Sequence, residues 1–542
     1  MTLPYLTDDC IYYILQHLQD DRLTLFKCLL VNRFWCKSTI PLLYANPFAN
    51  ITEKNYSITL TLILCFNKAE ILQLKNQLGS NQINNINFDK EHKPLFEYPK
   101  YLENYNNNTI SSVIYKWFVK YVSDLSIFKK LYYEIIPIFL QSILRQSRNI
   151  KQLDISINLF YKESFKNFNF QNFTSNLTKL NLLSLNFQNF QPSGTDHSTV
   201  NEEIEQEFLR NITNICTNAS KLLIKLARPY QHDTSNDLII TTTTLEKLCT
   251  IIQVQNKLKM FKIWDCHSLL NDILLSLEFQ KHSLVYVEFT ACDFSNVSLK
   301  RFNYLYNLEY LKFEYCKGIL LNQCESLNFS SFKLKELSFK LNYWNVDVTS
   351  LMIKYLGASL QRLLVETPTK SLIENISMYC PNLIFLKIRI CLRVDLSVIQ
   401  LFKNLRTRIL SITTLYDTDK FFINLANNIS INIGKIFLFS YSRNSSKFLK
   451  FKEFLENCHN SNNSLKVLGM MKLGKELNDE ELKLLNLIKA KGVEIISMMV
   501  PRYVEFSADF KWQKLPDIQE FLTIPLLFSG HALFGRSVEI IL

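Results

Sequence analysis

Glycine is scarce in this sequence, with only 10 among 542 residues. Phosphate-binding loops and dinucleotide-binding units need glycine where the backbone approaches the ligand closely, so such sites are not expected. One segment, Gly530 to Ser537, has the spacing of a phosphate-binding loop with Arg536 at the lysine position. That chemistry also needs a following helix, for which the five residues after Ser537 are too few. A nucleotide-dependent enzyme is therefore only the second alternative.

Other signals are missing as well. None of the 13 cysteines forms a C-x-x-C pair, which argues against a disulfide framework and against a zinc site. The eight histidines are dispersed, and no H-E-x-x-H or G-x-S-x-G motif occurs, so we expect no catalytic residue, metal or cofactor. Asp8 and Asp9 stand where a signal peptide needs positive charge, and the apolar run from Ile58 to Phe66 is too short to cross a bilayer. We expect an intracellular protein, cytoplasmic or nuclear, without membrane contact.

The charge does not indicate a nucleic-acid partner. The formal net charge is +12, but the basic residues are scattered and an acidic stretch runs from Glu202 to Glu207. The apolar fraction of 47% and the 40 phenylalanines are sufficient for an extensive core. A chain of 542 residues is too long for one ordinary domain, so several folding units or a repeat array are expected.

A repeat is present in the second half. Its pattern is L-x-x-L-x-L with Cys or Asn three residues later, and its leading leucines are 23 to 26 residues apart, within the range of leucine-rich repeats. Chance would place about 0.14 cysteines in the six final slots, and four are found. The copies are Leu258, Phe261, Ile263, Cys266; Leu284, Val287, Phe289, Cys292; Leu308, Leu311, Phe313, Cys316; Leu334, Leu337, Phe339, Asn342; Leu360, Leu363, Val365, Pro368; and Leu383, Leu386, Ile388, Cys391.

This pattern predicts a solenoid. The L-x-x-L-x-L segment is a short strand with alternate side chains facing inward, and one unit cannot bury its apolar side without stacked neighbours. The Cys or Asn turns inward at the bend, where it can satisfy buried backbone groups. Weaker copies extend the array in both directions: Ile150, Leu153, Ile155; Leu177, Leu180, Leu182; Ile433, Ile436, Leu438; Leu465, Leu468, Met470; and Val493, Ile496, Met498.

The region before the repeats is predicted to be helical. Val113 to Val122 and Ile135 to Leu144 carry apolar residues at helical spacing, and these helices would cap the first repeat. Two Asn-rich stretches, Asn81 to Asn87 and Asn104 to Asn108, are predicted to be loops.

Residues 3 to 47 predict three short helices. Thr7 can cap the first, Asp20 or Asp21 the second, and the third begins around Asn32 and is limited by Pro41. The apolar positions of these helices predict a small core that includes Leu15, Phe26 and Leu30. A core from fewer than fifty residues benefits from a partner.

Two segments resemble known families. The Cys-type repeats over about residues 150 to 500, with the run Cys380-Pro381-Asn382-Leu383, look like those of F-box leucine-rich-repeat proteins. Leu3-Pro4, the Ile14-Leu15-x-x-Leu18 face and Val31-Asn32-Arg33-Phe34-Trp35 resemble the F-box, whose signature includes V-x-[KR]-x-W. Pro4 lies about three residues farther from Ile14 than is usual, and the closing Leu-Trp appears here as Leu43-Tyr44.

The resemblance implies a partner. F-boxes dock a Skp-type adaptor, which links them to a cullin ubiquitin ligase, and the F-box protein itself performs no chemistry. The residues that match the adaptor contacts are Pro4, Ile14, Leu18, Val31, Arg33 and Trp35. The chain is accordingly expected to be a substrate receptor, with a ligase-independent leucine-rich-repeat scaffold as the alternative.

The predicted fold class is α/β, a leucine-rich-repeat solenoid preceded by a three-helix F-box and a helical linker. The expected boundaries are 1–47 for the F-box, 48–149 for the linker and cap, 150–500 for the solenoid and 501–542 for a terminal cap or tail. A protein target would bind the concave strand face, where mixed charges suit a protein better than a polyanion. The predicted contacts are Lys262, Trp264, Glu288, Lys312, Glu314, Lys387 and Arg389.

Overall fold

The fold is a single parallel sheet of 14 strands that follow one another in chain order. The computed structural model describes residues 7–49, 58–78, 94–121, 130–187, 199–226, 242–390, 395–414, 427–440, 465–471 and 492–498, with isolated positions between them. The predicted α/β class and repeated strand organisation are therefore confirmed. The strands are β1 Asn104–Asn106, β2 Gln152–Ser156, β3 Leu182–Asn186, β4 Lys221–Lys225, β5 Met260–Trp264, β6 Tyr286–Thr290, β7 Tyr310–Glu314, β8 Glu336–Lys340, β9 Arg362–Glu366, β10 Phe385–Ile390, β11 Ile409–Thr414, β12 Lys435–Ser440, β13 Val467–Met471 and β14 Glu494–Met498.

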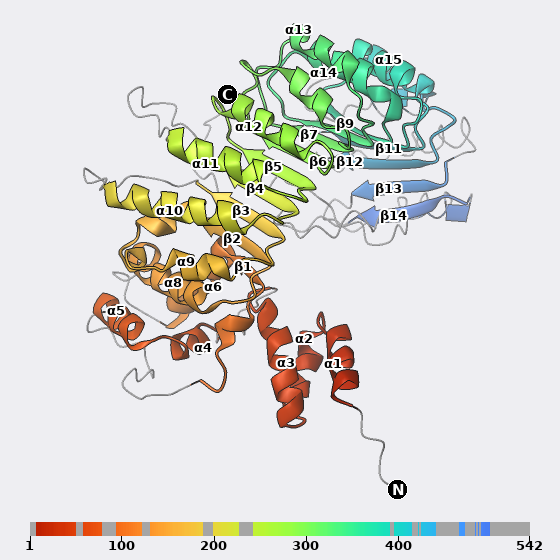
Figure 1. Ribbon diagram of the computed structural model, residues 1–542. Helices are drawn as coiled ribbons and strands as arrows, with labels where there is room; N and C mark the ends of the chain where they lie inside the picture. Colours follow the sequence, from red (N-terminus) through yellow and green to blue (C-terminus); the bar gives the residue numbers. More distant parts are fainter. Residues whose placement is uncertain are drawn as a thin grey trace, which may run out of the picture.

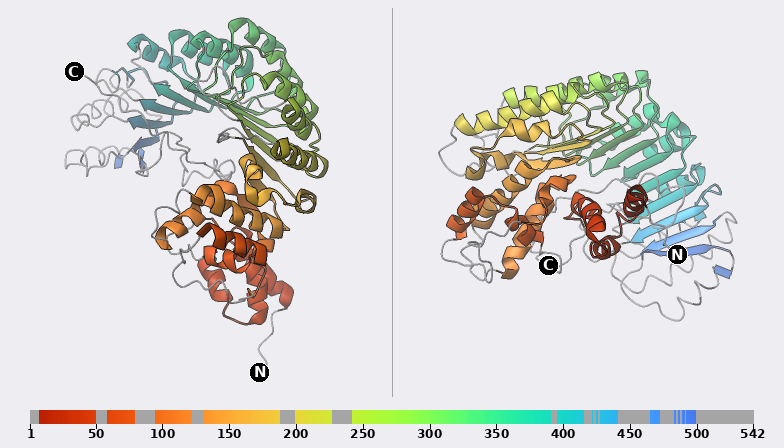
Figure 2. Two further views of the ribbon diagram at one scale, coloured as in Figure 1. Left: turned by 90° about the vertical axis from the view of Figure 1, so that its left-hand side faces the viewer. Right: turned by 60° about the horizontal axis from the view of Figure 1, so that its bottom comes forward.

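Helices cover one face of this sheet. The sheet curves into an arc, with the strands along its concave side and the helices along its convex side (Figures 1 and 2). A parallel pair needs such a crossover, because the chain must return to the same edge before each new strand. The helices of the arc are α9 Phe170–Ser175, α10 Thr199–Ile215, α11 Thr242–Gln253, α12 Leu270–Leu277, α13 Leu321–Cys324, α14 Val346–Leu356, α15 Lys370–Tyr379 and α16 Leu396–Gln400.

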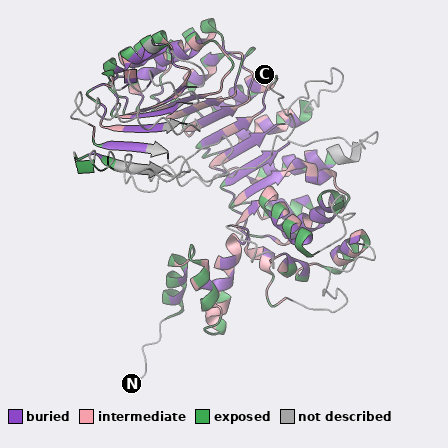
Figure 3. Cartoon of the chain, turned by 180° about the vertical axis from the view of Figure 1, so that it is seen from behind, coloured by how far each residue is buried: buried purple, intermediate pink, exposed green. Residues whose placement is uncertain are grey.

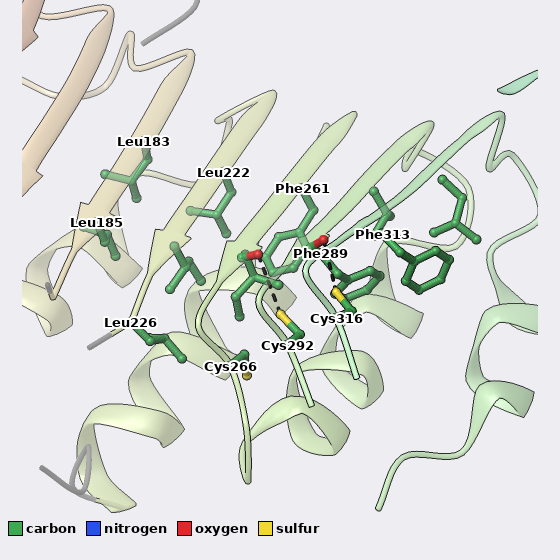
Figure 4. Close-up of a cluster of buried hydrophobic side chains, with 14 of the residues drawn as sticks. Leu183, Leu185, Leu222, Leu226, Phe261, Cys266, Phe289, Cys292, Phe313 and Cys316 are labelled. Carbon is green, nitrogen blue, oxygen red and sulfur yellow. Dashed lines mark hydrogen bonds between the residues drawn. The ribbon is translucent and has the colours of Figure 1, made fainter. Parts of the chain in front are cut away.

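The core lies between the strands and the helices. Successive strands pair in register, so that Phe289 of β6 lies beside Phe313 of β7. The rings of Phe289 and Phe313 stack with centroids 5.7 Å apart, and those of Phe313 and Phe339 with centroids 5.8 Å apart. Figure 4 shows this continuous row of apolar side chains crossing from repeat to repeat. Stacking thus buries the apolar side that one repeat alone would expose.

The slot after three of the strands works as the sequence predicted. The thiol of Cys316 donates to the carbonyl of Phe289 at 3.4 Å, and that of Cys292 to the carbonyl of Ile263 at 3.8 Å (Figure 4). In the next repeat, the amide Nδ2 of Asn342 donates to the carbonyl of Phe313 at 3.1 Å. The predicted satisfaction of buried backbone groups is therefore confirmed at these positions. Cys391 lies outside the described residues.

A left-handed residue ends five successive strands. Each has φ between 47° and 58°, although none is glycine. This conformation turns the N–H toward the next strand: Ala291 donates to the carbonyl of Glu314 at 2.7 Å, and Tyr315 to that of Lys340 at 2.8 Å. Since the conformation is unfavourable for residues with a Cβ, the hydrogen bonds of the ladder must compensate for it after each of these five strands. The five residues are Asp265, Ala291, Tyr315, Leu341 and Thr367.

Two weak copies were misaligned and two were missed. In β3 the positions that pair with Leu153 and Ile155 are Leu183 and Leu185, so the assignment to Leu177, Leu180 and Leu182 is wrong by three residues. In β14 the residue that pairs with Leu468 is Ile495, so the assignment to Ile496 is wrong by one. The missed copies are β4 and β11. Their leading positions are Ala219 and Thr407, which are fully buried but are not leucines.

The helical region before the repeats forms as predicted, with one exception. Its apolar residues join the main core, and its helices are α4 Ile58–Leu64, α5 Lys68–Leu78, α6 Asn107–Tyr121 and α8 Ile136–Gln146. However, Asn104 to Asn106 is strand β1 and not a loop, because Tyr105 pairs with Leu153 and is buried. The side chain of Asn106 also accepts from the N–H of Thr109 at 2.8 Å, at the start of α6.

Three helices lie at the N-terminal end, apart from the sheet (Figure 1). They are α1 Asp8–His17, α2 Arg22–Cys28 and α3 Arg33–Ala45. Thr7, Asp21 and Asn32 cap them through their side chains, as their sequence positions predict. Pro41 does not end the third helix, since it lies inside α3. It removes one helical hydrogen bond, and the burial of Ile40 and Leu43 on either side outweighs that loss.

Candidate functional site

The three-helix unit has a small core of its own. Within the described part of the chain, five buried apolar residues form it, and they make a cluster separate from the core of the solenoid. They are Ile11, Leu15, Leu25, Cys28 and Leu43. Leu18, Phe34 and Trp35 are partly buried and pack against this cluster. So few buried side chains supply little hydrophobic stabilisation.

Much of the apolar surface of this unit is exposed. Leu30 is 87% exposed and Val31 58%, at the turn between α2 and α3. Figure 3 shows how much of these helices is exposed compared with the buried strands. The expectation that Phe26 and Leu30 belong to the core is wrong, because α2 is only two turns long and turns Leu25 and Cys28 inward. The exposed set is distributed over α1, α2 and the turn before α3 and consists of Tyr12, Tyr13, Ile14, Leu23, Phe26, Leu30 and Val31; we call these residues together the apolar patch.

The structure places the predicted adaptor contacts in two groups. Ile14, Val31 and Arg33 are exposed, while Leu18 and Trp35 are half-buried against the small core. Pro4 lies outside the described residues. The sequence reasoning missed Tyr12, Tyr13 and Leu23, which lie off the apolar helical faces. Their large apolar side chains at polar-face positions were the available signal.

The end of α3 packs onto the beginning of the solenoid. The rings of Tyr44 and Tyr98 have centroids 4.4 Å apart, with Tyr98 in the short 3-10 helix Tyr98–Tyr101. The N–H of Glu103 donates to the carbonyl of Ala45 at 2.8 Å. Burial raises the pKa of Tyr44 to about 12, so its phenol stays neutral at this junction. The three helices are thus joined to the repeats by packing and not only by a tether.

On the concave face, four of the predicted target contacts form one ion-pair ladder. Nζ of Lys262 lies 2.8 Å from Oε2 of Glu288, and Nζ of Lys312 lies 3.0 Å from Oε1 of the same carboxylate. Lys312 also lies 3.0 Å from Oε2 of Glu314, which in turn pairs with Lys340 of the next strand. We call Lys262, Glu288, Lys312, Glu314 and Lys340 the charge ladder.

The ladder shifts the pKa values of its members. Burial by itself raises the pKa of Glu288, but the attraction of Lys312 and Lys262 outweighs it and lowers the pKa to about 2. Burial lowers the pKa of Lys312, and the attraction of Glu288 and Glu314 reverses this, so the net pKa is raised. Both groups are therefore held charged at neutral pH. Their charges are neutralised by ion pairs within the chain.

The remaining predicted contacts also interact within the chain. Nη1 of Arg389 lies 3.1 Å from Oε1 of Glu366. Nζ of Lys225 lies 5.4 Å from the centroid of the Trp264 ring, a cation–π distance. Lys387 of β10 is half-buried and also interacts with other groups. The sequence reasoning missed Lys340, Glu366 and Lys225, which could have been found by writing the last residue of each strand in one column.

Two classes of feature were not found within the described ranges. No group of three or more His, Cys, Asp or Glu side chains there is arranged to hold a metal ion. No helix in this part of the chain combines the length and the apolar character that crossing a bilayer requires. The segment from Gly530 to Ser537 lies outside the described residues.

The chain was compared with known proteins. No protein-family model matches it, and no curated protein matches its sequence significantly.

Proposed function

We propose that the chain is the substrate-recognition subunit of a Skp–cullin–F-box ubiquitin ligase. In this proposal the helices α1 to α3 are an F-box that docks a Skp-type adaptor, and through it a cullin. The solenoid of leucine-rich repeats binds a protein target. The chain has no catalytic residue of its own, and ubiquitin transfer depends on holding the target close to the charged conjugating enzyme.

The apolar patch carries this proposal. Among the described residues, α1 to α3 bury six apolar side chains and expose seven large ones, among them Leu30 and Val31 beside the Val31 to Trp35 signature. Exposed apolar surface on this scale marks a protein interface. In a protein interface, a few side chains that become fully buried on binding contribute most of the binding energy.

The junction with the solenoid also supports the proposal. Proximity catalysis requires a defined distance between the docking unit and the bound target. The contact of Tyr44 with Tyr98 and the hydrogen bond from Glu103 to Ala45 give such a connection, since they fix the end of α3 against the first repeat.

The test is a pull-down of a purified Skp-type adaptor with the intact chain and with Leu30→Asp. Leu30 is 87% exposed, so the substitution leaves the small core intact and places a charge in the patch. The matched control is Leu95→Asp, where the leucine is 81% exposed and lies outside α1 to α3. We expect the intact chain and the control to capture the adaptor, and Leu30→Asp to lose it.

The opposite results are equally informative. If no form of the folded chain captures the adaptor, the ligase proposal fails and a ligase-independent repeat scaffold becomes the better interpretation. If Leu30→Asp binds as well as the intact chain, the adaptor docks elsewhere than on the apolar patch.

A further inference from the structure

The charges on the concave face leave little attraction for an ionic partner. Each member of the charge ladder lies within ion-pair distance of a neighbour of opposite sign, and the carboxylate of Glu288 is shared by two lysines. A ligand that binds Lys262 or Lys312 must displace Glu288 from that lysine. The cost of breaking a buried pair is several kcal/mol. Lysines without an ion-pair partner among the described residues lie instead at the edge of the sheet.

A groove of about 660 Å³ runs along the edge of the sheet where the chain enters β5 to β8. Four successive repeats contribute to it, each with the residues that come before its strand. The lining includes Lys257, Lys259, His282, Tyr306, Glu309 and Lys333. The regular edge results from the repeat, since the carbonyl of Lys259 accepts from Val285 and Tyr286, and that of Val285 from Glu309 and Tyr310.

The groove is cationic. Lys257, Lys259 and Lys333 are exposed, and none has an ion-pair partner among the residues that the structure describes. The single carboxylate of the lining, Glu309, is neutralised by Lys335, whose Nζ lies 2.8 Å from its Oε1. Three ammonium groups therefore line the groove without an ion-pair partner in the described part of the chain, which favours an anionic ligand.

The dimensions fit a short extended peptide. Neighbouring strands are about 4.8 Å apart, so the distance from β5 to β8 is roughly 14 Å. An extended chain advances about 3.3 Å per residue, which corresponds to four or five residues. Lys257 and Lys259 lie at one end of this length and Lys333 at the other. Between them the rings of His282 and Tyr306 have centroids 5.6 Å apart and are tilted by 33° to each other.

We propose that this edge groove binds an acidic segment of a protein, with carboxylate or phosphate groups near Lys257, Lys259 and Lys333. The inference rests on the proposed function only in identifying the acidic segment as part of the target. In this proposal the target binds at the edge of the sheet, and the charge ladder stabilises the fold without contacting the target.

The test is fluorescence anisotropy of labelled hexapeptides with the full chain at low salt. The probes are hexaglutamate, a Gly-Ser hexapeptide with two phosphoserines, its unphosphorylated form and hexalysine. The variant reverses the groove charges with Lys257→Glu, Lys259→Glu and Lys333→Glu. The matched control, Lys300→Glu, Lys370→Glu and Lys403→Glu, changes the net charge equally at exposed positions of the helical layer.

We expect the acidic probes to bind, the neutral and basic probes not to bind, and salt to weaken the binding. The groove variant should bind about tenfold more weakly or worse, and the control variant should bind as the intact chain does. The two acidic probes separate carboxylate from phosphate recognition, since the tighter one identifies the preferred group. Circular dichroism checks that both variants are folded.

Three results would overturn the proposal: equal binding of hexalysine, unchanged binding by the groove variant, or equal loss in the control variant. Tighter, lysine-dependent binding of a single-stranded oligonucleotide would also overturn it in favour of a nucleic-acid site. No adaptor is present in this experiment. Failure of the groove and failure of adaptor docking on α1 to α3 are therefore distinguished.

Discussion

The carboxylate of Glu288 and the ammonium group of Lys312 lie 3.0 Å apart on the neighbouring strands β6 and β7. Lys262 of β5 contacts the other oxygen of the same carboxylate at 2.8 Å, and the phenol of Tyr286 donates to that oxygen at 2.7 Å. Because Glu288 is only 5% exposed, these contacts replace the water that the carboxylate would otherwise bind. Three repeats are thereby joined electrostatically as well as by their apolar core.

Glu288→Gln should loosen the middle of the solenoid. The substitution keeps the shape but leaves Lys262 and Lys312 without their shared counter-charge, at a cost of about 3 kcal/mol. Hydrogen–deuterium exchange of the β5 to β7 amides measures this local opening. Glu309→Gln is the control, since the Glu309 to Lys335 pair is a third to a half exposed and its loss should cost less than about 1 kcal/mol. Equal effects of the two substitutions would contradict this assignment.

The same carboxylate predicts an acid-sensitive stability. Its pKa is lowered from the ordinary 4.5 to about 2 in the folded state. A lowered folded-state pKa contributes stability that is present above pH 4.5 and is lost as the pH falls toward 2, a total of about 3 kcal/mol. Urea unfolding between pH 6 and pH 3 should show about two thirds of this loss in the intact chain and less of it in Glu288→Gln.

Asp154 supplies a control of opposite sign for that experiment. Burial raises the pKa of Asp154, and the attraction of Lys225 and the hydrogen bond from Ser184 offset this only in part. A carboxyl with a raised folded-state pKa favours the folded state at low pH and loses that contribution as the pH rises. Asp154→Asn should therefore change the pH dependence in the opposite direction to Glu288→Gln. A change in the same direction would show that the two carboxyl groups do not act independently.

Gly318→Ala should be strongly destabilising. Gly318 has φ of +85°, and a Cβ there would lie 2.3 Å from Oγ of Ser295 and 2.5 Å from its backbone N. Gly492 has nearly the same φ, +84°, but a Cβ there meets nothing within 4 Å. Gly492→Ala should cost about 1 kcal/mol for the left-handed conformation alone, and Gly318→Ala distinctly more. Thermal melting of both variants gives the comparison, and equal shifts in Tm would exclude the steric contribution.

The slot cysteines should be inert in the folded chain. Burial raises the pKa of Cys266 and Cys292 well above that of a free thiol, so neither provides the reactive thiolate. Maleimide labelling at pH 8, followed by mass spectrometry, should modify the exposed Cys10 rapidly. Cys266, Cys292 and Cys316 should react only after unfolding in urea. Rapid labelling of these three in the native chain would mean that the repeats open locally.

Much of the solenoid could be predicted from the sequence because its information is local. The strand alternation and the Cys or Asn slot lie within nine residues of each leading leucine, so Leu308, Phe313 and Cys316 were placed in the core without knowledge of their neighbours. The pattern does not reveal β4 and β11, because their leading positions are occupied by the small residues Ala219 and Thr407. Those positions are defined by burial and not by residue type.

The interactions of the predicted site could be derived less well from the sequence. Sequence reasoning selected Lys262, Glu288, Lys312 and Glu314 as positions on the strand face, and all four are there. Their pairing with one another was not foreseen. It depends on which residues of successive strands lie side by side, at separations of 24 to 26 residues along the chain.

The sequence by itself therefore determined the repeat, the faces of its strands and the caps of its first helices, because alternation and capping act over a few residues. The tertiary structure decided which charges neutralise one another, left Phe26 and Leu30 at the surface, and gathered Lys257, Lys259 and Lys333 along one edge. Those outcomes depend on register and packing between repeats, and no local pattern contains that information.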